Sequence, residues 1–410
     1  MSNPLLEGVR ILDLTRLLPG PFCTQYLAQL GAEVIKIEDP AGGDYARELM
    51  PELFAVVNRG KHSVTLDLRE ADDVAAFKQL VAGADVVVES FRPGVMERLG
   101  CGYETLKAIN PTLVYAALTG YGQNGPYRDA AGHDLNYLAY AGALDQIGSA
   151  GGAPAMANVQ IADLAGGALT AATGILAALL GAKVSGEGTF VDSSMLDGSL
   201  ALQPIALAGL RAHGHTQPRG ADMLTGALPN YQVYKCRDGR YLAVGALEPK
   251  FFARLLAALG EQVPLPKTLK ALAGGKASTG QRSRKPPTAD SGDQSRSGRP
   301  GLRDRFNEVL EDPARARRWL APVRWSLAGV FRLRPRDAWI RALSQADACV
   351  APVLTLEEAL ADPQVLARGM AEQVDGGPGI GCPLHFEGRR RDPLAPAPGL
   401  GDDNDWLLER

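Results

Sequence analysis

The chain opens its first structural unit with Val9-Arg10-Ile11-Leu12-Asp13-Leu14, a short apolar run that ends at the turn Leu18-Pro19-Gly20-Pro21. A second apolar run, Val34–Ile37, follows a segment in which apolar side chains recur at helical spacing. These side chains are Phe22, Tyr26 and Leu30. A strand, a helix and a second strand in this order are typical of a parallel sheet covered by helices.

The same unit repeats along the first half of the chain. Further strands are predicted at Ser63–Leu68, Asp85–Glu89, Leu113–Leu118 and Thr189–Ser193, with a helix over Glu70–Ala82. We therefore predict an α/β fold in which residues 1–193 form a large Rossmann-like domain with a mostly parallel sheet.

The second half has a different texture. Two runs, Tyr231–Cys236 and Tyr241–Ala246, are joined through Asp238-Gly239, which favours a hairpin. A helix is expected over Phe251–Leu259. The predicted division is a helical linker over 194–229, a small α+β domain over 230–360, and a C-terminal segment over 361–410 that returns to the large domain. Residues 274–301 carry no large apolar side chain, so a disordered insertion is expected there.

The composition excludes several classes of protein. The 410 residues are 46% hydrophobic and 22% charged, and a net charge of -3 gives no basic surface for nucleic acid. The five cysteines form no C-x-x-C pair, and His213-Gly214-His215 lacks a third ligand at metal-site spacing, so no metal is predicted. The apolar run Leu164–Ala182 barely reaches the ~20 residues of a membrane span, which favours a buried core helix. We expect a cytoplasmic protein without membrane contact.

The segment Gly120-Tyr121-Gly122-Gln123-Asn124-Gly125 matches the G-x-G-x-x-G pattern of dinucleotide-binding folds. In those folds the third glycine opens a helix, whereas Pro126 and a loop-like sequence follow here. We therefore reject the dinucleotide interpretation. The glycines are expected to let a backbone loop pass close to a substrate.

Basic residues fall where loops of the predicted sheet should line a ligand crevice. Asn58-Arg59-Gly60-Lys61 and Phe91-Arg92-Pro93-Gly94 both lie in connections, and Lys36 lies near a strand end. Arg and Lys at such positions suit phosphate groups, but ordinary surface charge explains them equally well.

Two side chains able to carry a proton lie where helices are expected to begin. These are His133, in Gly132-His133-Asp134, and Asp163, before the apolar run. Two such groups facing each other across one carbon meet the requirement for proton abstraction and return. Each also has a structural explanation, because a histidine at a helix start or an aspartate at an N-cap needs no chemistry.

The motifs together resemble the class III coenzyme A transferase superfamily. The resemblance rests on Ile11–Arg16 with Pro19–Pro21, Leu30–Glu38, Asn58–Leu68 and Phe91–Val95, and it returns near Ala346–Val353. Within the superfamily, Ala131–Tyr137 resembles the α-methylacyl-CoA racemase branch, as does Gly245–Pro249.

The racemase resemblance implies that His133 and Asp163 are the opposed acid and base that invert C2 of a 2-methyl-branched acyl-CoA through an enolate. Glu248, from a partner subunit, would support His133, and Asp134 would assist Asp163. Backbone N–H groups after Asp163 are expected to stabilise the enolate oxygen.

The resemblance also implies an interlocked homodimer whose active site lies between two subunits. The phosphates and adenine of CoA would meet the basic loops around Lys36, Arg59, Lys61 and Arg92. No cofactor is implied, because CoA is part of the substrate.

Two other functions remain open. A CoA transferase of the superfamily would use Asp163 as a covalent nucleophile and would not need His133. A non-catalytic CoA-binding protein is the third possibility, because residues 263–324 depart from the family pattern.

Overall fold

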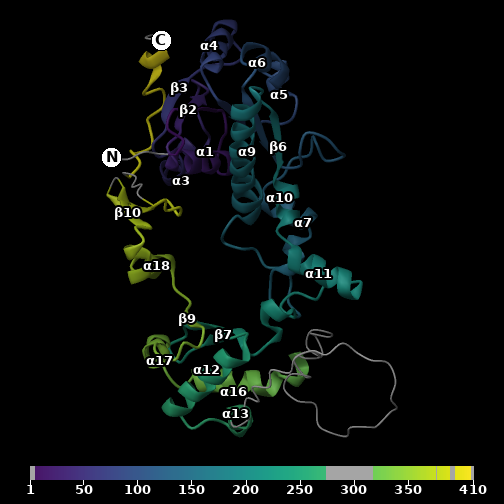
Figure 1. Cartoon of the computed structure of the whole chain (residues 1–410), viewed down its shortest axis with the longest axis vertical. Coiled ribbons are helices and arrows are strands. Elements are labelled where there is room, and N and C mark those ends of the chain that lie inside the picture. Colours follow the sequence, from purple (N-terminus) through teal and green to yellow (C-terminus); the bar gives the residue numbers. More distant parts are fainter. Residues whose placement is uncertain (1–4, 274–316, 375, 388–392, 408–410) are drawn as a thin grey trace. The chain divides into compact units, whose positions relative to one another are not determined.

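The computed structural model describes residues 5–273, 317–374, 376–387 and 393–407, and the predicted insertion lies outside them. The chain divides into two compact units (Figure 1). Unit 1 comprises Met1–Ile147, Ala155–Ile205 and Leu356–Arg410, and unit 2 comprises Gly148–Pro154 and Ala206–Thr355.

Unit 1 is built on a six-stranded sheet with the order β3-β2-β1-β4-β5-β6, in which every neighbouring pair is parallel. The strands are β1 (Arg10–Asp13), β2 (Glu33–Glu38), β3 (His62–Thr65), β4 (Val86–Glu89), β5 (Val114–Thr119) and β6 (Phe190–Ser194). The prediction of an α/β fold with a parallel sheet is therefore confirmed.

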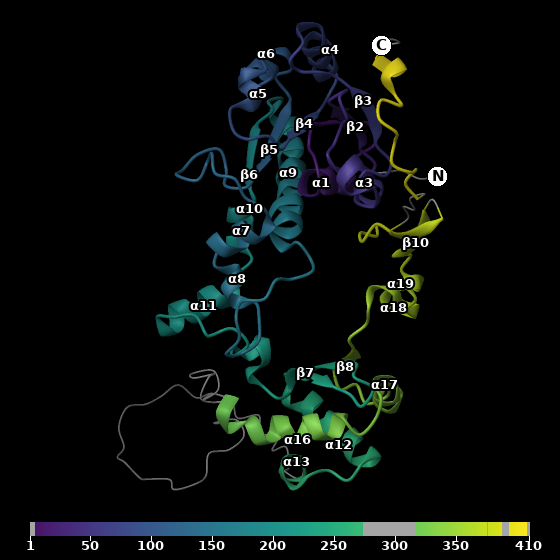
Figure 2. The same ribbon diagram turned by 180° about the vertical axis from the view of Figure 1, so that it is seen from behind.

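Alternate side chains of the strands enter two separate cores. In β1, Ile11 joins the core on one face, whereas Leu12 joins the core on the other. The first core is covered by α1 (Pro19–Gln29), η1 (Ala162–Leu169) and α9 (Thr170–Ser185), and the second by α4 (Ala71–Ala82) and α6 (Tyr103–Ile109). Figure 2 shows α4 and α6 beside the strands of unit 1. Strands that are buried on both faces have nearly continuous apolar sequences, and for this reason they could be predicted from the sequence.

Short helices complete unit 1, and most of them had no clear signal in the sequence. They are α2 (Ala46–Leu49), α3 (Pro51–Val57), α5 (Val95–Arg98), α7 (Asp134–Tyr140), α8 (Ala143–Gln146) and α10 (Met195–Ala201). Helix α11 (Pro204–His213) follows α10 and lies mostly in unit 2, which begins again at Ala206.

The helix formed by η1 and α9 spans 24 residues with a mean hydropathy of 1.7, and within the described ranges it is the one helix long and apolar enough to cross a membrane. A core helix meets the same criterion. Ala171, Ile175 and Leu179 pack into the first core of unit 1, and 39% of the apolar stretch is buried.

Helix α10 belongs to unit 1, although its residues fall in the predicted linker over 194–229. The backbones of α10 and η1 touch, since a Cβ on Gly198 would overlap the carbonyl group of Gly166. This close approach of two glycines is not visible in the sequence pattern, and it moves the unit boundary to residue 205.

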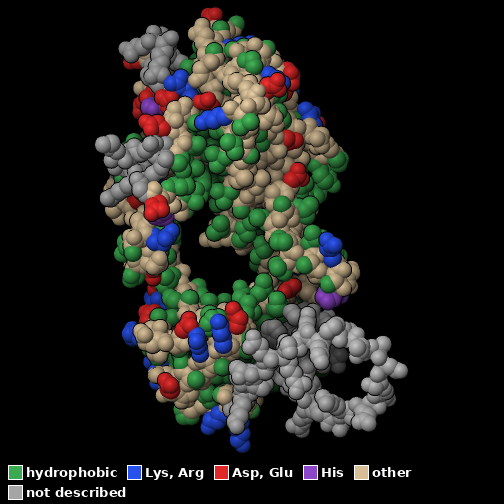
Figure 3. Space-filling view, in the orientation of Figure 1, with side chains coloured by type: hydrophobic (Ala, Val, Ile, Leu, Met, Phe, Trp, Pro, Cys, Tyr) green, Lys and Arg blue, Asp and Glu red, His purple; other side chains and the backbone are tan. Residues whose placement is uncertain are grey.

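Unit 2 contains a three-stranded antiparallel sheet with the order β7-β8-β9. Its elements are η2 (Met223–Ala227), β7 (Tyr231–Lys235), β8 (Tyr241–Gly245), α12 (Pro249–Gln262), α13 (Lys267–Ala273), α16 (Ala321–Phe331), α17 (Arg336–Leu343) and β9 (Val350–Pro352). The predicted hairpin is present, and the helices bury Trp339 and Phe331 in one core. Figure 3 shows charged side chains on the surface of this unit.

The C-terminal segment returns to unit 1 from Leu356 onward. It contains α18 (Leu356–Leu360), α19 (Pro363–Ala367), β10 (Ala371–Val374), β11 (Gly377–Ile380) and η3 (Asn404–Leu407). The segment covers the edge strand β3, because Asp403 and Asn404 accept hydrogen bonds from the backbone N–H groups of Ser63 and Thr65.

Candidate active site

Several of the predicted site residues follow the carboxyl ends of strands, with Arg92 after β4 and His133 and Asp134 after β5. The strand order reverses between β1 and β4, because the chain runs outward from β1 through β2 to β3 and then returns to β4. Ligands of open α/β sheets bind in the crevice outside the strand ends at such a switch point. The loops after β1 and β4 flank this crevice.

The helix starts that carry His133 and Asp163 lie side by side. His133 is the N-cap residue of α7 and is exposed, and Asp163 is half-buried in the first turn of η1. The Asp134 carboxylate joins the two starts, since its Oδ1 accepts the N–H groups of Ala162 at 2.7 Å and Asp163 at 3.0 Å. Asp163 is therefore not the N-cap that its position suggested. The capping carboxylate comes from Asp134, on the other helix.

The Asp163 carboxyl has the protonation behaviour of an acid–base group. Burial raises its pKa from 3.8 to about 7, and the nearby charge of Asp134 adds to this effect. Burial and the charge of Asp163 in turn raise the pKa of Tyr137 to about 12, and the Tyr137 hydroxyl donates to the carbonyl oxygen of Gly132 at 2.5 Å. At neutral pH the carboxyl of Asp163 is thus populated both with and without its proton.

The backbone N–H groups expected to stabilise an enolate oxygen are already bound. Asp134 accepts the N–H of Asp163, and the N–H of Leu164 donates to the carbonyl oxygen of Gln160 at 2.9 Å. These two N–H groups therefore have partners inside the protein, because Asp134 occupies the start of η1, and stabilisation of an enolate by the groups after Asp163 stays a prediction.

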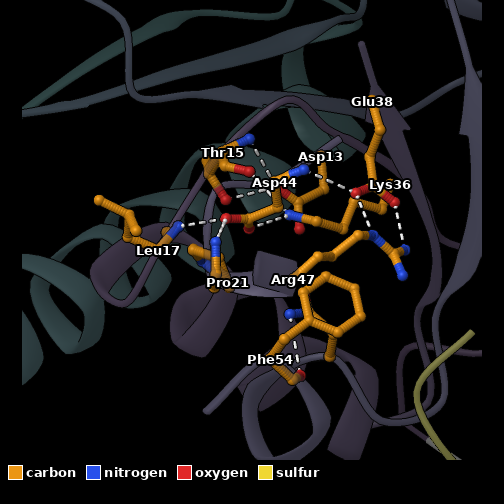
Figure 4. A network of polar contacts seen from close by, with 12 residues as sticks. Asp13, Thr15, Leu17, Pro21, Lys36, Glu38, Asp44, Arg47 and Phe54 are labelled. Atoms are coloured by element: carbon orange, nitrogen blue, oxygen red, sulfur yellow. Dashed lines mark hydrogen bonds and ion pairs between the residues drawn. The ribbon is translucent and has the colours of Figure 1, made fainter. Parts of the chain in front are cut away.

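Four buried charged residues at the ends of β1 and β2 and in the following loops form a network that we call the buried clamp (Figure 4). Its members are Asp13, Lys36, Asp44 and Lys61, and all four side chains have an exposed fraction of 0%. The Lys61 ammonium lies 2.9 Å from the Asp13 carboxylate, and the Lys36 ammonium lies 3.0 Å from the Asp44 carboxylate.

The clamp holds the loop that follows β1. Asp13 accepts the N–H of Thr15 at 2.9 Å, and Asp44 accepts the N–H of Leu17 at 2.9 Å. Leu17 has a φ of +64°, a left-handed conformation that costs an L-residue about 1–2 kcal/mol. The strained backbone persists because buried carboxylates fix it from both ends.

Burial alone would raise the pKa of Asp13, but the charges of Lys61 and Lys36 and two hydroxyl hydrogen bonds outweigh it and hold that pKa well below its usual range. For Lys61, burial lowers the pKa to about 8 despite the attraction of Asp13.

Three of the four predicted CoA contacts are engaged inside the protein. Lys36 and Lys61 are paired with buried carboxylates, so the structure gives no support to their predicted direct contact with a phosphate. Arg59 is buried too, and it donates to Glu372 at 3.0 Å and to the carbonyl oxygen of Ile380 at 2.8 Å, which ties it to the C-terminal hairpin. Arg92 is exposed at the carboxyl edge.

Two arginines that the sequence analysis missed lie beside the loop of Arg92. A Cβ on Gly94 would lie 3.4 Å from Nη1 of Arg98 and 3.4 Å from Nη2 of Arg128. The loops after β4 and β5 share one sheet edge, which brings these guanidinium groups together. The only signal for them in the sequence was their position close behind predicted strand ends.

The glycine-rich segment after β5 is a loop, as predicted, and no helix follows it before α7. Gly120 is required by packing, since a Cβ there would lie 2.4 Å from the Tyr137 ring. Gly122 and Gly125 adopt φ values of +84° and +83°, which glycine tolerates.

Glu248 lies in unit 2, where it is the N-cap residue of α12 and is exposed. Its backbone carbonyl accepts the N–H groups of Phe251 and Phe252. All five cysteines are free, and the described residues contain no group of three side chains able to hold a metal.

Comparison with known proteins places these features in a family. The pattern of CoA-transferase family III matches residues 6–283 and 297–404. Two similar relatives are the α-methylacyl-CoA racemases of Mus musculus and Homo sapiens, 36% and 33% identical over 87% and 86% of this chain and 79% and 78% of their own. The succinyl-CoA:glutarate CoA-transferase of Mus musculus is 39% identical over 60% of this chain and 58% of its own.

Solved structures agree with the sequence matches. A CAIB/BAIF family protein from Brucella suis has a TM-score of 0.79 at 27% identity, covering 100% of this chain and 99% of its own. A hypothetical protein from Mycobacterium tuberculosis has a TM-score of 0.77 at 29% identity, covering 99% of both chains. The chain belongs to CoA-transferase family III.

Proposed function

We propose that this protein is a racemase that inverts C2 of 2-methyl-branched acyl-CoA thioesters. The thioester carbonyl acidifies the hydrogen at C2. In one direction neutral His133 takes this proton while the C2–H electron pair passes into an enolate, and protonated Asp163 then delivers its proton to the opposite face. In the reverse direction the two groups exchange roles.

The observation that carries this proposal is the Asp163 carboxyl, whose pKa burial raises to about 7 beside the helix start of His133. A group that must act as acid in one direction and as base in the other works best when its pKa lies near the working pH. The identity to two α-methylacyl-CoA racemases over most of the chain supports the same reaction.

We further propose a homodimer in which Glu248 of one subunit supports His133 of the other. The exposed Glu248 carboxylate at the start of α12 is available for such a contact. Apolar side chains exposed on α9, α10 and α11 are consistent with an interface, and green side chains lie open over the middle of unit 1 in Figure 3. Members of this set are Leu180, Val184, Leu200, Ile205 and Leu210.

The CoA phosphates are proposed to meet Arg92, Arg98 and Arg128 around Gly94, in place of the buried lysines. Guanidinium groups suit phosphates because they present several N–H donors in one plane. No cofactor besides the CoA of the substrate enters the reaction. The free cysteines suit a reducing compartment, and we propose the cytoplasm.

A second candidate is a CoA transferase in which Asp163 attacks the acyl-CoA and forms a mixed anhydride. Its support is the similarity to transferases, including 39% identity to a succinyl-CoA:glutarate CoA-transferase over 60% of the chain. A nucleophilic carboxylate must be ionised, however, and burial with Asp134 nearby favours the protonated form of Asp163.

One experiment separates the two reactions. The wild-type enzyme is incubated with 2-methylacyl-CoA in deuterium oxide, and a parallel sample receives hydroxylamine. We expect deuterium at C2 and no mass adduct on the peptide that contains Asp163. A hydroxamate on Asp163 without exchange at C2 would establish the transferase instead.

A further inference from the structure

The loops that follow β1 and β4 meet across the switch point through one side chain, Arg16. Its guanidinium carbon lies 4.9 Å from the ring centroid of Tyr45 and 5.0 Å from that of Phe91. Nη1 of Arg16 donates to the Tyr45 hydroxyl at 2.9 Å. Phe91 is itself fixed, because its N–H donates to the buried carboxylate of Glu89 at the end of β4.

The buried clamp fixes the backbone on both sides of Arg16. Thr15 is bound through its N–H by Asp13 and through its carbonyl oxygen by the Lys36 ammonium, at 2.9 and 2.7 Å. Leu17 is bound through its N–H by Asp44 at 2.9 Å and stays in a left-handed conformation. Arg16 therefore leaves the loop in a direction set by buried contacts.

The charges inside the clamp neutralise each other, whereas Arg16 has no carboxylate partner among the contacts of the described residues. Its half-buried guanidinium stands on aromatic rings and keeps N–H groups available. Arg92 follows Phe91 directly, so a second cation flanks the same crevice. The place suits an anion that reaches the switch point from solvent.

We propose that Arg16 binds the phosphate-bearing part of the CoA thioester at the switch point, and that the buried clamp is a positioning device for Arg16. The proposal deepens the proposed function, because the same substrate supplies the phosphates. The competing explanation is that Arg16 only ties the loops of Tyr45 and Phe91 together.

The first test compares Arg16→Met with the wild-type enzyme for binding of CoA and of a pantetheine thioester, which lacks the nucleotide, by calorimetry. We expect CoA binding to weaken about 10- to 100-fold, as for loss of one charge-assisted bond, with pantetheine binding unchanged. Arg16→Lys keeps the charge without the planar stack and should recover part of the loss.

Arg10→Met is the matched control, since Arg10 lies at the opposite edge of the same strand and pairs with Glu33. It should leave both affinities unchanged. If Arg16→Met weakened CoA and pantetheine thioesters equally, Arg16 would only hold the loops and the proposal would be overturned.

The second test addresses the clamp with the double variant Lys36→Met/Asp44→Asn, which removes both charges of one pair and leaves neither unpaired. We expect a rise in KM for acyl-CoA with kcat nearly unchanged. Added to Arg16→Met, the double variant should cost little more, because both changes act through one guanidinium. Fully additive losses would show that the clamp does not act through Arg16.

These outcomes stand apart from those of the proposed reaction. An enzyme without C2 exchange whose CoA affinity still depends on Arg16 would contradict the racemase and support this inference. An enzyme that exchanges the C2 proton and whose CoA affinity is unchanged by Arg16→Met would support the racemase and contradict this inference.

Discussion

Asp13, in the buried clamp, and Asp163, at the start of η1, are two carboxyl groups of the same unit with opposite acid strengths. Asp13 is fully buried, yet its pKa stays well below the usual range because two ammonium groups outweigh the cost of burial. Asp163 is half-buried, yet its pKa is raised to about 7 because burial acts together with the neighbouring carboxylate of Asp134. Burial raises the pKa of both carboxyls, and the ammonium groups beside Asp13, which reverse this effect, separate a structural carboxylate from one suited to proton transfer.

The largest effect on stability is expected when Asp13 loses a neighbouring cation. Lys61→Met removes the ammonium 2.9 Å from Asp13 and leaves a buried carboxylate without its closest cation. We expect unfolding in urea to show a loss of about 3–5 kcal/mol. Arg69→Met, which removes an exposed partner of Asp67, should have a much smaller effect, because solvent screens this pair. Equal stability of the two variants would contradict the structural role of Lys61.

Asp163→Asn should instead stabilise the fold at alkaline pH. The native state holds the Asp163 proton up to about pH 7, whereas the unfolded chain releases it near 3.8, so stability falls as the pH rises between these values. Removing the charge should recover about 1–3 kcal/mol at pH 8 and little at pH 4 in urea unfolding. The control Asp72→Asn, on the exposed first turn of α4, should be neutral or slightly destabilising. An Asp163→Asn variant less stable than wild type at pH 8 would count against a raised pKa.

A smaller effect is expected at the arginines around Gly94. Arg92→Ala should raise KM for acyl-CoA about tenfold with kcat roughly unchanged, because a phosphate contact is shared by ground and transition states. Steady-state kinetics with a pantetheine thioester should show no change. A loss of kcat with unchanged KM would place Arg92 in the chemistry.

The smallest expected effect is a change in the pKa of Asp163 when the charge of Asp134 is removed. Asp134→Asn keeps an oxygen for the N–H groups of Ala162 and Asp163 but removes the nearby negative charge. The pKa of Asp163 should then fall, by about one pH unit or less, since burial is its larger cause. The pH profile of kcat/KM measures this. An upward shift would mean that Asp134 does not act on Asp163 through its charge.

The sequence was a good guide to the sheet of unit 1 because both faces of its strands are buried. Apolar runs such as Val9–Leu14 then mark the strands directly. The partners of the two lysines could not be predicted in this way. Lys36 and Lys61 stand close to strand ends whether they face a ligand or a buried carboxylate, and Lys61 pairs with Asp13 across 48 positions of the chain. A buried strand that contains Asp13 was the one hint, because such a charge requires a partner.

In the candidate site, too, local features were predicted and long-range contacts were not. The positions of His133 and Asp163 at helix starts were predicted from local sequence and are present. The hydrogen bond that joins these helix starts runs from the N–H of Asp163 to the carboxylate of Asp134, 29 positions away, and no local sequence pattern predicts it. The approach of α10 to η1 through Gly198 is a similar long-range contact. Local patterns reveal elements and their ends, whereas these contacts are set by packing.

The central claim is that His133 and Asp163 act on opposite faces of C2. Its most direct test follows deuterium incorporation at C2 of each pure enantiomer of a 2-methylacyl-CoA, by mass spectrometry, in His133→Ala and Asp163→Asn. In both variants the rate of interconversion of the enantiomers should fall about 10²–10⁴-fold below that of the wild-type enzyme. Each variant should still exchange one enantiomer, the one whose proton faces the remaining base, and the two variants should exchange opposite enantiomers. Interconversion by either variant at close to the wild-type rate, or exchange of the same enantiomer by both, would contradict the account.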